Sequence, residues 1–170
     1  MTPSVESVID LPDVGQIAYV VEDIERGMDR YIDLFGVEPW TVTRIEPPEL
    51  RDTTYRGEEA EFGFRAGVAH AGETMLEFIE PTMGESIYSE HLDEYGPGMH
   101  HIAYFGWDAE ETEAVVADLR EAGIEAAQTG HFQGTDFWYF DTREELNGLM
   151  FETAIRRNVE SRETTQYPPE

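Results

Sequence analysis

Hydrophobic positions along the chain follow a pattern that occurs twice. Residues 14–21 form a short apolar run that predicts a buried strand, and an aspartate then precedes a segment, 24–35, with apolar side chains at helical spacing. Residues 99–106 and the segment after them repeat this arrangement, and Gly36 and Gly123 are placed to end the two helices. Three further apolar runs in each half predict strands at residues 40–45, 60–69 and 74–80, and at 125–129, 136–140 and 148–154.

The two halves are also related residue by residue. Gln16-Ile-Ala-Tyr19 matches His101-Ile-Ala-Tyr104, and the match continues into the helices that follow. Each half therefore predicts a βαβββ unit. We expect a first module at 14–81, a connecting helix and linker at 82–98, a second module at 99–154 and a loose polar C-terminal tail at 155–170. The first half is longer because of residues 47–59, which we expect to form an exposed loop.

Composition limits the kinds of partner and the cellular environment that the protein can have. The chain has 170 residues, of which 37 are acidic and 11 basic, so its net charge is −26, and every basic residue is arginine. Such a charge repels phosphate backbones and anionic membranes, which argues against nucleic acid or a membrane as partner. It also favours a cytoplasm of high salt concentration, where self-repulsion is screened. The absence of cysteine excludes disulfides and thiolate chemistry. We therefore expect a cytoplasmic protein that takes a small molecule.

Four polar side chains stand at equivalent positions of the repeat, within otherwise apolar strands. Gln16 corresponds to His101, and Met75-Leu76-Glu77 aligns with Met150-Phe151-Glu152. Two buried carboxylates need a compensating cation, and a divalent metal would find three oxygen donors and one imidazole here. The alternative is that Glu77 and Glu152 are ordinary solvated acids, with Gln16 and His101 as hydrogen-bonded residues. His100 adjoins His101, and strand alternation predicts that it points to the opposite face.

These features resemble those of the vicinal oxygen chelate superfamily, which includes glyoxalase I, methylmalonyl-CoA epimerase and the extradiol dioxygenases. The resemblance covers residues 14–154, and Ser86-Ile87-Tyr88 through Gly98–Tyr104 is similar to the inter-module stretch of the epimerases. It implies an α+β fold in which two tandem βαβββ modules form a curved mixed sheet around a metal-binding cleft. It also implies a homodimer and one divalent metal ion per site. The implied metal ligands are Gln16, Glu77, His101 and Glu152.

The resemblance implies a metal-dependent isomerase or lyase that removes a proton next to a carbonyl of a thioester or hemithioacetal. Glu152 would be the leading base and Glu77 its counterpart. The epimerases usually have histidine in place of Gln16 and glutamine in place of Glu77, so this ligand set is closer to that of glyoxalase I. It leaves zinc, manganese, cobalt, nickel and magnesium as candidates.

Two questions about binding stay open at this level. A coenzyme A substrate would need cations for its phosphates, and the first-half insertion and its neighbourhood offer several arginines that would otherwise offset nearby acids. They are Arg44, Arg51, Arg56 and Arg65. A different class of function is non-catalytic small-molecule binding, as in the drug-sequestering members of the same superfamily.

Overall fold

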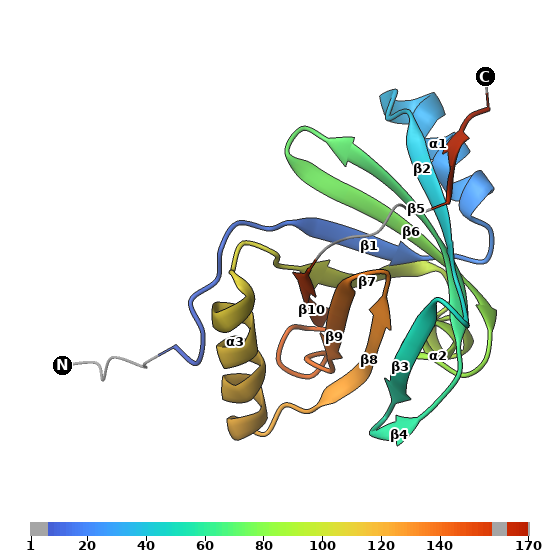
Figure 1. Ribbon diagram of the computed structural model, residues 1–170. Helices are drawn as coiled ribbons and strands as arrows, with labels where there is room; N and C mark the ends of the chain where they lie inside the picture. Colours follow the sequence, from blue (N-terminus) through green and yellow to red (C-terminus); the bar gives the residue numbers. More distant parts are fainter. Residues whose placement is uncertain (1–6, 158–162, 170) are drawn as a thin grey trace.

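The computed structural model describes residues 7–157 and 163–169, and it confirms an α+β fold with one curled, open sheet (Figure 1). Helices are few: α1 (Ile24–Phe35), α2 (Ile87–Tyr95) and α3 (Ala109–Glu121). The strands of the first half are β1 (Gln16–Val20), β2 (Trp40–Ile45), β3 (Leu50–Tyr55), β4 (Glu58–Glu59), β5 (Gly63–Ala71) and β6 (Thr74–Met83). Those of the second half are β7 (Gly98–Ala103), β8 (Ala126–Phe132), β9 (Thr135–Phe140), β10 (Met150–Arg156) and β11 (Thr164–Tyr167).

The sheet has an approximate twofold arrangement about its middle. Its strand order is β11-β2-β5-β6-β1-β7-β10-β9-β8-β3-β4. β1 and β7 pair antiparallel at the centre, β1 pairs parallel with β6 on one side, and β7 pairs parallel with β10 on the other. The first and last strands of each βαβββ repeat are therefore neighbours, and four such strands lie side by side in the middle of the sheet.

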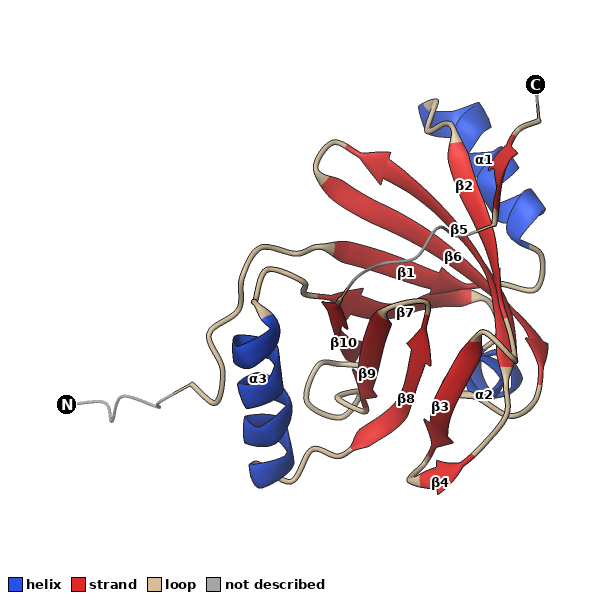
Figure 2. Ribbon diagram, viewed as in Figure 1, coloured by secondary structure: helices blue, strands red, loops and turns tan. Residues whose placement is uncertain are grey.

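The helices form where the sequence provides caps and apolar faces. The Asp23 side chain accepts a hydrogen bond from the Arg26 amide at the start of α1, and Gly36 ends that helix with φ 65°. Asp108 caps α3 in the same way. Ile24 and Met28 of α1 pack against residues of β2 and β6, while α3 packs against β9 and β10. Figure 2 shows both helices outside the curve of the sheet.

The connecting helix has a different position. Ser86 and Ser89 form a capping box at its start. The ring of Tyr88 contacts both Phe64 of β5 and Tyr139 of β9, which belong to different halves. α2 therefore packs into the central core, where it bridges the two modules. None of the helices in the described ranges is long and apolar enough to cross a membrane.

Two segments expected to lack structure form strands instead. Residues 47–59 contain β3 and β4, and β3 pairs antiparallel with β8 of the second half. Leu50 of β3 is buried in the central core, so this segment is not an exposed loop. The expected loose tail contains β11, which pairs antiparallel with β2 of the first half. Residues 158–162 and 170 of that tail lie outside the described ranges. Each half thus supplies an outer strand to the other.

Ion pairs connect residues 47–59 to the connecting helix and to the second half. Arg56 follows β3, and its guanidinium binds Glu90 of α2 at 2.5 Å and Asp141 after β9 at 2.7 Å. Arg143 binds the same Asp141 at 2.7 Å and Glu90 at 3.1 Å. The pKa of Asp141 is lowered far below its usual range, first by the hydrogen bond from Arg143 and then by Arg56. This four-residue network joins three elements that are distant in sequence.

Candidate functional site

The four polar residues of the repeat converge in the middle of the sheet. Gln16 is on β1, Glu77 on β6, His101 on β7 and Glu152 on β10, which are adjacent strands. Gln16, His101 and Glu152 are buried, and the Glu77 side chain is only 13% exposed. These positions follow from strand alternation, because Leu76 and Phe78 on either side of Glu77 pack toward α1. The interpretation of Glu77 and Glu152 as ordinary solvated acids is therefore wrong.

The polar atoms of the other three residues lie around His101 Nε2. His101 Nε2 lies 2.9 Å from Glu152 Oε2, 3.7 Å from Glu77 Oε2 and 3.4 Å from the amide nitrogen of Gln16. The Gln16 amide also donates a hydrogen bond to Glu77. All four side chains from the two modules thus reach a common centre on the inner face of the sheet.

Electrostatic interactions in this centre are strong because it is buried. Burial alone would lower the pKa of His101, but the carboxylates of Glu152 and Glu77 outweigh it and raise the pKa to about 9. Burial raises the pKa of Glu77, and the charge of Glu152 adds to that effect while His101 opposes it. The pKa values of Glu77 and His101 are thus both raised within one buried cluster, an arrangement typical of a functional site.

The donor set fits a divalent cation. Glu152 Oε2 is buried without a hydrogen-bond partner in the described part of the chain, despite its proximity to His101 Nε2. A carboxylate oxygen in that state is costly unless a cation compensates it. The amide of Gln16 presents nitrogen in this arrangement, and rotation by half a turn would present its oxygen at the same place. Two carboxylates, one amide oxygen and one imidazole form a ligand set used by several divalent metals.

His100 does not lie where strand alternation predicts. Its Nδ1 atom is 2.9 Å from Nδ1 of His101, so the two side chains are adjacent. The cause is a bulge: Ala18 pairs with His101 but Tyr19 pairs with Met99, which leaves His100 as an extra residue in β7. An alternation argument cannot detect such a bulge. His100 also contacts Tyr88 and His91 of α2.

A cleft of about 90 Å³ opens onto the centre. Gln16, Glu77 and Glu152 line it, together with aromatic and aliphatic side chains and one cation. The aromatic lining residues are Phe64, Phe105, Phe132, Phe137 and Tyr139. The cation is Arg156 at the end of β10, a residue that the sequence analysis assigned to the tail. The sequence analysis did not identify it, although continuing the alternation of Glu152 and Ala154 along one strand face to Arg156 could have done so.

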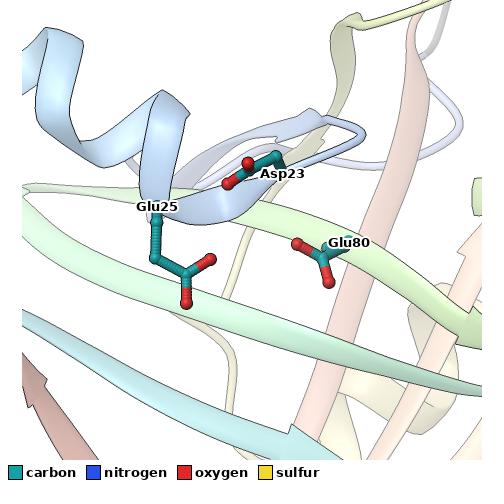
Figure 3. Close-up of side chains that lie close together, drawn as sticks. All are labelled: Asp23, Glu25 and Glu80. Atoms are coloured by element: carbon teal, nitrogen blue, oxygen red, sulfur yellow. The ribbon is translucent and has the colours of Figure 1, made fainter.

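A second group of acids lies away from the cleft. Asp23, Glu25 and Glu80 come together at the start of α1 (Figure 3). Each has a structural partner: Asp23 caps the helix, Glu80 accepts a hydrogen bond from the Ile24 amide at 3.0 Å, and Arg65 pairs with both glutamates. These contacts account for the cluster as part of the helix start.

The four arginines considered for coenzyme A all have acidic partners. Arg44 binds Glu46 at 2.6 Å and Arg51 binds Asp52 at 3.1 Å. Arg56 and Arg65 belong to the groups described above. This favours the interpretation that these arginines offset the charge of nearby acids and do not form a phosphate-binding site.

Comparisons with known proteins agree with the fold. The chain resembles a methylmalonyl-CoA epimerase variant of Streptomyces coelicolor in complex with 2-nitronate-propionyl-CoA, with a TM-score of 0.59 and 20% identity over 89% of this chain and 99% of that one. The methylmalonyl-CoA epimerase of Mycobacterium tuberculosis gives a TM-score of 0.57 and 15% identity, over 84% and 87% of the two chains. A search of curated protein sequences found no significant match.

At the level of sequence, residues 15–140 match the profile of a single family. The match begins just before Gln16 and includes Glu77 and His101, while Glu152 lies beyond its end. It extends over most of the chain and over both repeats. The chain belongs to the Glyoxalase/Bleomycin resistance protein/Dioxygenase superfamily.

Proposed function

We propose that this protein is a metal-dependent isomerase or lyase that removes a proton from a carbon next to a carbonyl and returns it, as an epimerase or a glyoxalase does. The observation that carries the proposal is the convergence of four polar side chains on one buried centre; they are Gln16, Glu77, His101 and Glu152. The likeness to epimerase structures and the family membership support it.

In this proposal the four side chains hold one divalent ion. A bound ion would supply positive charge to the carbonyl oxygen while the neighbouring carbon loses its proton. Glu152 takes that proton, because its carboxylate lines the cleft beside His101. Glu77 lies on the other side of His101, on β6, and is placed to return a proton.

The walls of the cleft support this chemistry. Aromatic rings from both halves line it, and Tyr139 packs against the ring of His101 with centroids 4.9 Å apart. Burial raises the pKa of Tyr139 well above its usual value, so its hydroxyl stays neutral. Low polarity around the carboxylates strengthens their interaction with any developing charge. The substrates proposed are small thioesters or hemithioacetals.

The first experiment is metal analysis of the purified protein after incubation with divalent ions, beside a Glu77→Ala, Glu152→Ala double variant. We expect about one ion per chain in the natural protein and loss of that ion in the variant. An Asp23→Ala, Glu25→Ala double variant is the matched control, since it removes two acids of the other cluster. Absence of metal from the natural protein would overturn the proposal and favour a non-catalytic binding protein.

The second experiment follows exchange of the proton next to the carbonyl for deuterium, on a thioester and on a hemithioacetal. Glu152→Gln should reduce the exchange rate at least ~100-fold, because the amide cannot accept the proton. Glu73→Gln is the control, since Glu73 is exposed in the turn between β5 and β6. Full exchange activity in Glu152→Gln protein would exclude Glu152 as the base.

A further inference from the structure

Arg156 differs from the other arginines around the cleft. Its guanidinium carbon lies 4.9 Å from the centroid of the Phe105 ring, and both residues line the cleft with Gln16, Glu77 and Glu152. No carboxylate pairs with Arg156 within residues 7–157 and 163–169. Its neighbour Arg157, by contrast, binds Glu113 at 2.7 Å and Asp136 at 3.3 Å.

Arg26, Arg30 and Arg120 also have no ion pair among the described residues, but Arg156 is the one of these four that lines the cleft. The net charge is −26, so an arginine without an acidic partner has many potential partners on the same molecule. Stacking on Phe105 holds the guanidinium at the cleft by a cation–π contact. Its hydrogen-bond donors have no carboxylate partner among the described residues, and a guanidinium binds carboxylate or phosphate oxygens in a bidentate manner.

The strand geometry fixes how far this cation is from the reacting centre. Glu152 and Arg156 are on the same face of β10, four residues apart, which corresponds to about 13 Å along the strand. Phe105, just after β7, follows His101 by four residues, as Arg156 follows Glu152. The backbone of Arg156 therefore lies well beyond the centre, while its side chain lines the same cleft and is near enough to contact the same small substrate.

The neighbouring surface does not compete for this role. A hollow of about 440 Å³ adjoins the cleft at Phe132, which lines both. Its charged lining includes Glu46, Glu49 and Glu163, and its arginines, Arg44 and Arg65, are ion-paired. An anion would be repelled there, so Arg156 is the favourable place for one.

We propose that Arg156 binds an anionic group of the substrate at the end of the cleft, so that the protein selects carbonyl compounds with a second, remote negative charge. This inference rests on the proposed function for the reacting end of the substrate. Carboxylate and phosphate share the required chemistry. Arg156 would act as a specificity residue, not as a proton carrier.

Straight-chain acids test this as molecular rulers, without any need for turnover. Binding of suberate, which has a carboxylate at each end, is compared with binding of octanoate, which has one, by calorimetry on protein with and without cobalt. We expect suberate to bind more tightly than octanoate by about 10-fold to 100-fold, the range for a charge-assisted hydrogen bond. Succinate, which is too short to span the distance, should lack this advantage. The phosphonate analogue of suberate distinguishes phosphate from carboxylate preference.

The variants decide the role of Arg156. Arg156→Gln should remove the advantage of suberate over octanoate, and Arg156→Lys should restore it in part. Arg157→Gln is the matched control, because it removes the same charge from the adjacent residue. An unchanged suberate advantage in Arg156→Gln, equal loss in Arg157→Gln or no advantage in the natural protein would each overturn the inference. Failure to bind cobalt would instead count against the proposed function, and the ratio of the two acids would still be measured without metal.

Discussion

At the scale of single residues, the candidate centre combines four side chains that the repeat relates to one another with neighbours that the repeat does not relate. Gln16, Glu77, His101 and Glu152 could be found because the repeat places them at equivalent positions in apolar strands. His100 could not, because its contact with His101 depends on a bulge opposite β1. Arg156 is the last residue of β10, but the apolar pattern predicts a strand that ends at residue 154, so the sequence places Arg156 in the polar tail.

His100 leads to a prediction about metal affinity. When Nε2 of His101 binds a cation, the ring proton is on Nδ1, which then donates its hydrogen bond to Nδ1 of His100. A partner of this kind orients the metal ligand, and its loss typically reduces metal affinity about 10-fold to 100-fold. We expect a reduction of about this size for His100→Phe. Metal titration monitored by competition with a chelator measures it.

The comparison variant is His70→Phe, since His70 is exposed near the end of β5. His100→Asn, which keeps a polar atom at the site, should recover part of the affinity. Equal affinity in the natural protein and in folded His100→Phe would show that this contact does not orient His101.

At the scale of elements, strands with apolar alternation were predicted well, and strands held mainly by backbone pairing were not. β11 has the sequence Thr-Thr-Gln-Tyr and depends on its hydrogen bonds to β2. β3 has one buried residue at its start, Leu50, followed by polar ones, and it has no counterpart in the second half. Neither carries the periodic signal that identifies β5 or β10. Both β3 and β11 form because they pair with strands that are distant in the sequence.

The ion-pair network between these elements predicts a dependence of stability on pH. The pKa of Asp141 is lowered in the folded protein by Arg143 and Arg56. Burial raises the pKa of Glu90, but Arg56, Tyr55 and Arg143 together outweigh burial and lower it. A lowered folded-state pKa stabilises the fold above the unfolded value, near about 4, and the contribution disappears as the pH falls through the folded value. Asp141→Asn should therefore cost about 1 kcal/mol near neutral pH, a modest figure because the network is partly exposed.

Denaturant unfolding at neutral and acidic pH checks this. The difference between the natural protein and Asp141→Asn should shrink as the pH falls below about 4, since protonated aspartic acid resembles asparagine. Asp93→Asn on the exposed side of α2 is the control. A difference that is constant over this pH range would mean that the network does not stabilise the fold through the charge of Asp141.

At the scale of the whole molecule, the net negative charge is the main influence on how stability depends on salt. The acidic residues far outnumber the arginines, and several arginines are already paired with acids, so repulsion among the rest opposes the compact state. Salt shortens the Debye length to about 3 Å at 1 M and screens this repulsion. We expect the melting temperature to rise between about 0.1 M and about 3 M KCl.

Melting curves monitored by circular dichroism over that range test the expectation. Sucrose at matched water activity serves as the control, because it favours compact states by exclusion without screening charge. A melting temperature that rises equally in sucrose, or not at all in KCl, would contradict charge screening as the cause.

The exchange of outer strands has a consequence for how a ligand enters. The two halves meet along three seams of backbone hydrogen bonds: β1 with β7 at the centre, and β3 with β8 and β11 with β2 at the margins. A hinge motion that parted the halves would have to break the marginal seams together. We therefore expect ligands to enter the cleft without separation of the halves, so that the side chains at its entrance select among them.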